Sequence, residues 1–200
     1  DSGSLGPEVE QSQKHGFEII RIAKSEFNHG GTRQKAVQHL RSDCDVVVFL
    51  TQDAILAGPL TLKNLLAAFE DASVSAAYGR QLPHKGAGPL GAHARHFNYG
   101  SVSSMRSISA VPDLGFKTCF ISNSFAAYRV ADLMAVGGFS SDVILGEDTC
   151  VAAKLILSGK QVAYVAEACV YHSHDYSTLE EFRRYFDTGV LHAQQPWLIE

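Results

Sequence analysis

Ionisable side chains stand where apolar runs of this sequence end, and these are the residues that could do chemistry. Asp53 directly follows the run VVVFL at residues 46–50, and His172 and His174 close a strand-like run, where alternation places both on one face. A carboxylate together with an imidazole can bind a divalent cation. Each also has a simpler interpretation, because Asp53 could cap the helix that begins near Pro59 and a histidine at a strand end is often structural.

Two adjacent acids, Glu147 and Asp148, open a helical pattern at residues 146–160. The helix dipole stabilises carboxylates at this end, which would explain either acid without a function. Adjacent helical positions point about 100° apart, so one acid can cap the helix while the other enters a cleft as a general base. Arg33 stands in the first turn of another predicted helix, where the dipole disfavours a cation. We expect it either on the surface or facing an anion such as a phosphate.

The elements that must position these residues alternate along the chain. Strands are predicted at residues 17–22, 45–50, 74–79, 118–129 and within 161–174, and helices at residues 33–41, 59–71, 131–139, 146–160 and 178–195. This alternation predicts an α/β layered fold with a mostly parallel central sheet. In such sheets ligands bind beyond the carboxyl ends of the strands, where Asp53 and His172 stand.

Two segments depart from simple alternation. Residues 83–115 mix glycine, proline and basic residues without a period, and they predict an irregular loop that either closes over a ligand or stays a mobile surface loop. The last helix begins with a capping box made by Ser177 and Glu180. Its apolar residues recur at helical spacing, which predicts a face buried in the core or in a dimer rather than a platform for a sugar, and they are Phe182, Tyr185, Phe186 and Val190.

Length and charge narrow the class of protein. A chain of 200 residues predicts one domain, and a formal charge of -4 argues against nucleic acid as a partner. No apolar run approaches the ~18 residues that span a bilayer. The chain begins at Asp1 without a methionine, so we expect a fragment or a processed form.

In their order along the chain, the motifs resemble those of the family 2 inverting glycosyltransferases, which have the GT-A fold, and most closely the bacterial rhamnosyltransferase branch. The motifs are DSGS, EFNHGGTRQKA, FLTQDA, SNSFAAYR, VGGF, ILGEDT, AYVAEACVYHSHDY and EFRRYFDTGV. They cover nearly the whole chain. The resemblance implies a single GT-A domain over residues 1–200 that lacks the first strand of the family.

The resemblance also implies roles for single residues. The nucleotide-sugar donor would be bound by Asp1, Ser2, Arg33, Gln34, Gln52 and Asp53. Asp53 and His172 would hold Mg²⁺ or Mn²⁺, with His174 as the alternative to His172. Asp148 would be the catalytic base with Glu147 beside it, and Asn123, Arg80 and His174 are candidates for acceptor or loop contacts. Two positions depart from the family, because Thr51 replaces the first acid of its metal motif and Gln34 replaces an asparagine.

The activity implied is transfer of a sugar, with inversion, to a hydroxyl of a cell-surface polysaccharide or glycolipid precursor. The donor expected for this branch is dTDP-L-rhamnose. A cytoplasmic location, contact with the inner face of the membrane and a homodimer are further expectations. Thr51 and the missing first strand leave a non-catalytic sugar-nucleotide-binding module, or an inactive fragment, as the alternative. A nucleotidyltransferase shares the layered sheet and the metal chemistry, but the Glu-Asp motif followed by the histidine strand argues against it.

Overall fold

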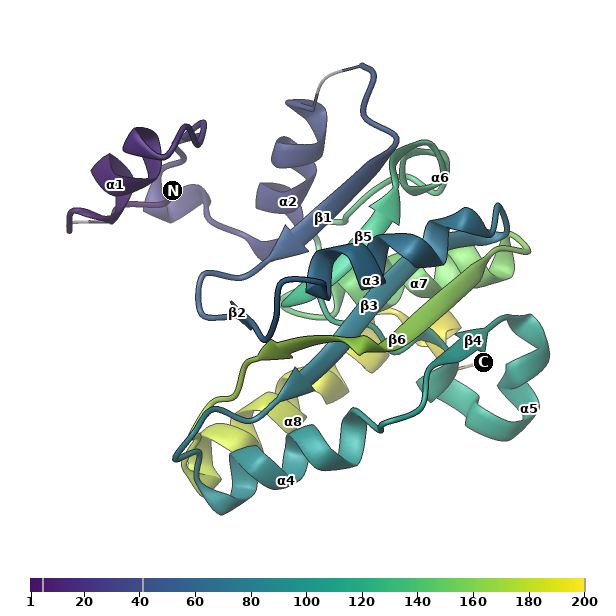
Figure 1. The fold of residues 1–200 in the computed structure, drawn as a ribbon. Coiled ribbons are helices and arrows are strands. Elements are labelled where there is room, and N and C mark those ends of the chain that lie inside the picture. The colour runs from purple at the N-terminus through teal and green to yellow at the C-terminus, as the bar shows by residue number, and fades with distance from the viewer. Residues whose placement is uncertain (5, 41, 200) are drawn as a thin grey trace.

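Six strands form one sheet in residues 1–4, 6–40 and 42–199, which the computed structural model describes (Figure 1). The strands are β1 (Val46–Leu50), β2 (Ile55–Leu56), β3 (Val74–Leu82), β4 (Ser104–Arg106), β5 (Phe125–Arg129) and β6 (Gln161–Tyr171). The α-helices are α1 (Glu8–Lys14), α2 (His29–Gln38), α3 (Thr61–Ala67), α4 (Pro89–Asn98), α5 (Val111–Leu114), α6 (Val130–Ala135), α7 (Glu147–Leu157) and α8 (Thr178–Gln194).

The sheet is mixed rather than mostly parallel. Its order is β1-β5-β3-β6-β2, with β4 also paired to β6. Among these strands only β3 and β6 pair in parallel, and the other four pairs are antiparallel. The α/β layered fold is confirmed, but the prediction of a mostly parallel sheet was wrong. Residues 83–124 connect the end of β3 to the start of β5, so that β5 runs antiparallel to β3, and β4 within this segment pairs antiparallel with β6.

The apolar run at residues 17–22 is not a strand, contrary to its prediction. Its backbone bonds instead to the start of the chain, where the amino group of Asp1 donates to the carbonyl of Ile20 and the Ile22 N–H donates to the carbonyl of Asp1. This part of the chain and α1 lie to one side of the sheet (Figure 1). An apolar run becomes a strand only where a neighbouring strand offers a ladder, and here the ring of Phe17 stays exposed.

The segment at residues 83–115 is not an irregular loop either, because it contains α4, β4 and α5. Its proline and glycine residues occupy positions that a helix tolerates. Pro89 is in the first turn of α4, where its missing N–H costs nothing. Gly91 lets the helix approach the carbonyl oxygen of His174, which a Cβ would meet at 2.6 Å. Composition alone therefore does not predict α4, which packs beside the segment that carries His172 and His174 (residues 172–175, the histidine segment).

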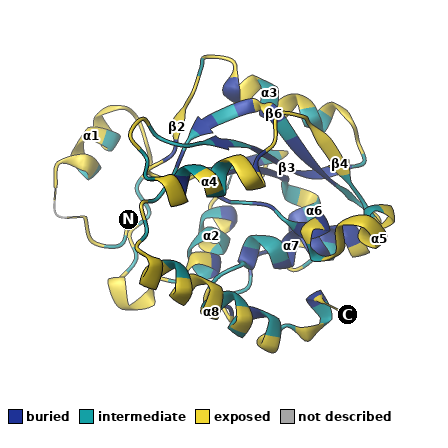
Figure 2. Ribbon diagram, turned by 90° about the horizontal axis from the view of Figure 1, so that it is seen from below, coloured by how far each residue is buried: buried dark blue, intermediate teal, exposed yellow. Residues whose placement is uncertain are grey.

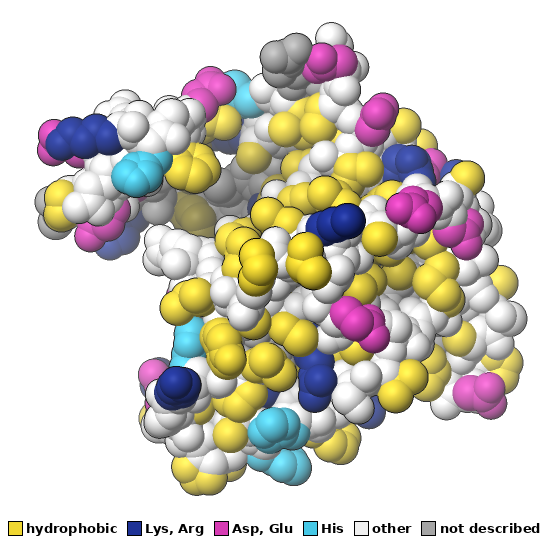
Figure 3. Space-filling model, viewed as in Figure 1, with side chains coloured by type: hydrophobic (Ala, Val, Ile, Leu, Met, Phe, Trp, Pro, Cys, Tyr) yellow, Lys and Arg dark blue, Asp and Glu magenta, His cyan; other side chains and the backbone are white. Residues whose placement is uncertain are grey.

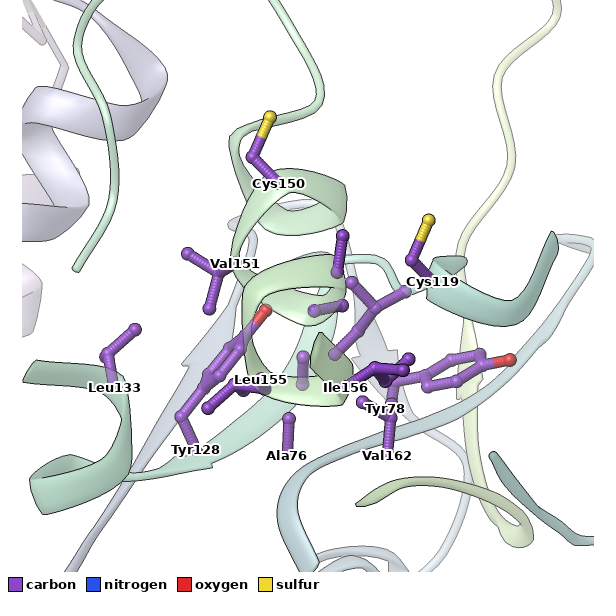
Figure 4. Packing of buried hydrophobic residues seen from close by; sticks show 14 of the residues in the cluster. Ala76, Tyr78, Cys119, Tyr128, Leu133, Cys150, Val151, Leu155, Ile156 and Val162 are labelled. Atoms are coloured by element: carbon purple, nitrogen blue, oxygen red, sulfur yellow. The ribbon is translucent and has the colours of Figure 1, made fainter. Parts of the chain in front are cut away.

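The core lies on both faces of the sheet, which is why β3 and β5 are buried along nearly their whole lengths (Figure 2). Helix α7 covers one face and α3 the other (Figures 1 and 2). Figure 4 shows Val151 and Leu155 of α7 packed beside Tyr128 of β5. Each such fully buried side chain contributes about 1.5–3 kcal/mol relative to an exposed one. The start of α7, with its two acids, is thereby fixed against the sheet.

The capping box of α8 is confirmed, but its apolar face is not part of the core. Ser177 accepts from the Glu180 N–H while the Glu180 carboxylate accepts from the Ser177 N–H. The side chains of Phe182, Tyr185 and Phe186 are all more than 60 % exposed. Much of α8 is accordingly yellow in Figure 2. The prediction of a core face was wrong, because α8 presents only Leu191 as a buried residue. A dimer face stays a prediction.

A second group of exposed apolar side chains gathers over β2 and α3, seen as yellow in Figure 3. Ile55, Leu60, Leu62 and Leu66 belong to it. No helix in the described part of the chain is long and apolar enough to cross a membrane.

Close packing at Gly30 gives a first prediction, because it joins α2 to the loop before α7. A Cβ on Gly30 would lie 1.8 Å from the carbonyl oxygen of Ser140, whereas one on Gly31 would meet nothing closer than 3.5 Å. We expect Gly30→Ala to lower the free energy of unfolding by about 1–3 kcal/mol. Gly31→Ala, the matched control in the same helix, should be neutral or slightly stabilising. Urea denaturation of both variants measures the difference, and equal midpoints would contradict the close contact.

Candidate active site

A cavity of about 520 Å³ opens at the carboxyl ends of β3 and β6, between α4 and α8. The candidate base Asp148 and both histidines, His172 and His174, line it. Helix α4 contributes Arg95 and helix α8 contributes Arg184. The structure therefore brings together, around one cavity, residues that lie far apart in the sequence.

Asp53 and the two histidines form a cluster that could hold a metal ion. The Asp53 Oδ2 atom lies 3.4 Å from His172 Nε2 and 3.8 Å from His174 Nε2. All three candidate ligand atoms lie within 4.8 Å of one another. The pairing of Ile55 with Tyr171 explains this proximity, since it places the turn after β1 beside the end of β6.

Gln81 prepares His172 for metal binding. The buried imidazole has its Nδ1 atom 2.8 Å from the Gln81 side-chain oxygen, and the Gln81 amide donates to the Ser122 hydroxyl. The imidazole N–H therefore donates from Nδ1, which leaves the lone pair of Nε2 directed toward Asp53. Burial, above all, lowers the pKa of His172 to about 4, so the ring is neutral near neutral pH. A neutral imidazole with one fixed N–H is the form that ligates a metal.

The carboxylate of Asp53 is ionised and partly exposed. Burial alone would raise its pKa, but the Thr51 hydroxyl, His172 and His174 together lower it below the usual value. Two neutral imidazoles and one carboxylate suit divalent cations such as Mn²⁺. The residues therefore fit the metal ion that the resemblance implies, and the Thr51 hydroxyl lies beside the acid.

The adjacent acids at the start of α7 have different surroundings. Asp148 lines the cavity and accepts hydrogen bonds from the backbone N–H groups of Asn123 and Thr149 at 3.0 and 2.8 Å. Glu147 points away into the core, where its Oε1 atom is 2.7 Å from Arg33 Nη1 and accepts from the Asn123 amide at 3.2 Å. Burial and the charge of Glu147 raise the pKa of Asp148 to about 7. A carboxylate with such a pKa is suited to accept a proton near neutral pH.

The predicted donor residues Arg33 and Gln34 make contacts inside the protein. The anion that Arg33 faces is the Glu147 carboxylate, and Gln34 accepts from the Phe139 N–H at 2.9 Å. Both side chains tie α2 to the segment that leads into α7. Contact of either residue with a donor stays a prediction.

The other predicted residues lie at separate places. Asp1 borders a smaller cavity of about 210 Å³ with Lys35, and its carboxylate accepts from Ser4. Ser2 is half-buried and Gln52 is exposed next to Asp53. Arg80 donates from Nε to the carbonyl of Tyr99 at 3.3 Å, so it supports the loop after α4. None of these four lines the main cavity among its described residues.

Two residues that organise the site are not among those predicted from the sequence. Gln81 fixes His172, and Tyr128 donates to the Asn123 side-chain oxygen at 2.8 Å and so orients the Asn123 amide toward Glu147. A signal for Gln81 existed, because a polar residue that continues a buried strand must find a hydrogen-bond partner. Its partner could not be read from the sequence, since His172 belongs to another strand.

The Arg33–Glu147 pair gives a prediction about stability, since its side chains are only 17 % and 6 % exposed. We expect Arg33→Met to lower the free energy of unfolding by about 3 kcal/mol, because Glu147 then keeps a buried charge without its partner. In the double variant Arg33→Met/Glu147→Gln, the loss of unfolding free energy should be smaller than the sum of the two single losses by about 1–3 kcal/mol. A double-mutant cycle in urea measures this coupling, and strictly additive effects would show that the pair does not interact.

Known proteins resemble this chain in sequence and in fold. No protein-family model matches the chain. The O-antigen chain rhamnosyltransferase RfbN of Salmonella typhimurium is 52% identical over 199 residues, which are 99% of this chain and 63% of that protein. The O-antigen chain rhamnosyltransferase WbaN of Salmonella anatum is 53% identical over 180 residues, 90% of this chain and 57% of that protein. The chain thus spans about six tenths of the length of these relatives.

Solved structures share the fold at low sequence identity. The mannosyltransferase PcManGT of Pyrobaculum calidifontis, solved in complex with GDP-Man and Mn²⁺, has a TM-score of 0.61 at 18% identity over 86% of this chain and 46% of its own. The structure of residues 1–349 of TarS from S. aureus has a TM-score of 0.63 at 16% identity, and the match covers 86% of this chain and 48% of the TarS chain. The chain is therefore a homologue of the bacterial O-antigen chain rhamnosyltransferases, and its fold is that of the GT-A glycosyltransferases.

Proposed function

We propose that this chain is the catalytic part of an inverting, metal-dependent glycosyltransferase that moves L-rhamnose from dTDP-L-rhamnose to a saccharide hydroxyl. One observation carries the proposal, namely that His172 and His174, which form a cluster with Asp53, line the same cavity as Asp148, the carboxylate at the start of α7. The names of the two Salmonella relatives support rhamnose as the sugar.

In this proposal the donor diphosphate lies against Asp53, His172 and His174. A bound Mg²⁺ or Mn²⁺ supplies Lewis-acid stabilisation of the negative charge on the departing diphosphate. The buried imidazole of His172, held by Gln81, keeps its Nε2 lone pair on that side of the cavity. The remaining donor contacts are assigned to Asp1, Ser2, Arg33, Gln34 and Gln52 by resemblance.

Asp148 acts on the other substrate. Its raised pKa lets the carboxylate remove the proton from the acceptor hydroxyl as the oxygen attacks the anomeric carbon. Attack from the face opposite the diphosphate inverts the configuration. A retaining double displacement, as in most retaining glycoside hydrolases, would need a second carboxylate as nucleophile about 5 Å away. Glu147 does not serve as one, because Arg33 and Asn123 hold it in the core.

The acceptor is proposed to be a precursor of a cell-surface polysaccharide, as the O-antigen relatives suggest. Asn123 contributes by holding both acids, Asp148 through its backbone N–H and Glu147 through its side chain. Binding at the membrane, a cytoplasmic location and dimer formation stay predictions.

The test is a panel of nucleotide sugars assayed with Mn²⁺ and a saccharide acceptor, with released nucleotide and the anomeric configuration of the product as readouts. We expect turnover with dTDP-L-rhamnose and inversion of its anomeric carbon. Donor binding in calorimetry without any transfer or hydrolysis would instead support the non-catalytic module. A retained configuration would overturn the single-base mechanism.

A further inference from the structure

We propose that Arg95 of α4 and Arg184 of α8 form an anion subsite in the cavity that binds a phosphate group of a substrate, separately from the metal cluster. The subsite deepens the proposed function, and it rests on that function only for the identity of the substrate. Arg95 is the main anchor, and Arg184 completes the subsite from the opposite wall.

The guanidinium of Arg95 has one nitrogen without a hydrogen-bond partner and no counter-ion among the described residues. Its Nε atom is buried and has no hydrogen-bond partner, and within the described residues no carboxylate pairs with its side chain. Its guanidinium carbon lies 5.9 Å from the centre of the Tyr99 ring, which is a neutral partner. A partly buried cation without a counter-ion is costly unless a ligand supplies the charge.

The fold holds Arg95 at a fixed place. Gly91 and Arg95 are four residues apart, so they share the face of α4 that lines the cavity. The close approach of Gly91 to the His174 carbonyl sets the distance of this helix from the histidine segment. The Gly88 N–H donates to the Asp175 carboxylate at 2.6 Å and anchors the helix start to the same segment. A guanidinium held in this way is organised before any ligand binds.

Arg184 reaches the same space from α8. Glu181, Arg184, Tyr185 and Thr188 recur at helical spacing and line the cavity opposite α4. The guanidinium carbon of Arg184 lies 4.9 Å from the Tyr176 ring centre, and its Nη1 atom forms a long ion pair of 3.8 Å with Glu181 Oε1 of the same helix. The Tyr176 ring in turn stacks on the His174 ring, with the ring centres 4.9 Å apart, so α8 reaches the histidine segment that α4 contacts through Gly91.

The chemistry of the pair favours phosphate. A guanidinium matches phosphate oxygens with two parallel hydrogen bonds, which a neutral sugar hydroxyl does not require. Two cations beside a metal cluster also offset the charge of an anion better than the cluster alone. The phosphate has two possible sources, the diphosphate of the donor or a phosphate carried by the acceptor.

The first experiment measures inorganic diphosphate binding to the protein by calorimetry, with chelator present so that metal does not contribute. We expect Arg95→Gln to weaken this binding about tenfold, since a charge-assisted contact is lost. Arg184→Gln should weaken it less, because this side chain is about half exposed. It also supplies a second test if Arg95→Gln fails to fold. The matched control is Arg183→Gln, an exposed neighbour that does not line the cavity, and it should bind as the wild type does. Equal binding by all four proteins, or an equal loss in the control, would overturn the subsite.

The second experiment assigns the source of the phosphate. If the donor supplies it, Arg95→Gln weakens dTDP binding in the presence of Mn²⁺. If the acceptor supplies it, the variant raises KM for a saccharide phosphate and leaves KM for the same saccharide without phosphate unchanged. A variant that alters neither quantity contradicts the proposal. A wild-type protein that binds inorganic diphosphate but no nucleotide sugar would refute the proposed function and leave the subsite in place.

Discussion

Asp148→Asn is expected to lower the rate of sugar transfer about a thousandfold, because general-base catalysis contributes about 10²–10⁴-fold and an amide cannot accept the proton. Donor affinity should be unchanged, since the cluster around Asp53 is intact. Turnover and calorimetry with dTDP and Mn²⁺ measure the two effects separately. The matched control is Asp142→Asn, an exposed acid just before α7 that should be fully active. A variant at Asp148 with wild-type turnover would show that another group removes the proton.

The raised pKa of Asp148 also predicts how wild-type activity and stability depend on pH. The transfer rate should rise with pH through about 7, because only the ionised carboxylate accepts a proton. Stability should change in the opposite direction. In the folded state Asp148 keeps its proton up to about pH 7, whereas in the unfolded chain it loses the proton near pH 3.8. The protonated carboxyl group therefore stabilises the fold fully below pH 3.8, and this stabilisation is lost as the pH rises toward 7.

The charge of the ionised Asp148 carboxylate should also make the stability of the Asp148→Asn variant differ from that of the wild type. Asparagine removes the repulsion by Glu147, so the variant should melt above the wild type at pH 8 and lose this advantage near pH 4. Thermal unfolding monitored at both pH values tests this. An advantage of the same size at both would mean that the carboxyl group has an ordinary pKa.

Asp53→Ala is expected to weaken Mn²⁺-dependent binding of dTDP by more than about a hundredfold, because even residues that only orient a metal ligand are worth 10–100-fold. The carboxylate is the only anionic member of the cluster with His172 and His174. Gln81→Leu should weaken Mn²⁺ binding about tenfold by freeing the His172 ring, without touching the metal. Manganese titration followed by electron paramagnetic resonance measures both variants, and calorimetry measures the nucleotide.

The matched control for the metal site is Asp113→Asn, an exposed acid of α5 outside the cluster, which should bind Mn²⁺ and dTDP as the wild type does. His174→Ala decides between the two histidines, since a small effect would leave His172 as the imidazole ligand. Unchanged Mn²⁺ binding in Asp53→Ala would refute the cluster as the metal site.

Much of the site was predictable because its residues follow elements with strong local patterns. The run at residues 46–50 became β1 and delivers Asp53 to the edge of the sheet, as its apolar continuity predicts. The helix after Glu147 and Asp148 and the capping box of α8 were also recognisable, because helix starts are encoded within four residues. Asp148 faces the cavity and Glu147 does not. This agrees with the expectation that two adjacent helical residues point in different directions, so that only one of the acids enters the cleft.

Other features depended on contacts between distant parts of the chain. The sequence by itself determined the α/β class, most helices and strands, and the positions of Asp53, Asp148 and His172 at element ends. Only the tertiary structure decided that residues 17–22 lack a strand partner, that Pro89 and Gly91 begin a helix, and that Arg33 pairs with Glu147. It also decided that Gln81 orients His172. The physical reason is that periodicity specifies which face of an element is apolar, whereas the partner of a buried polar group depends on sheet register and helix docking.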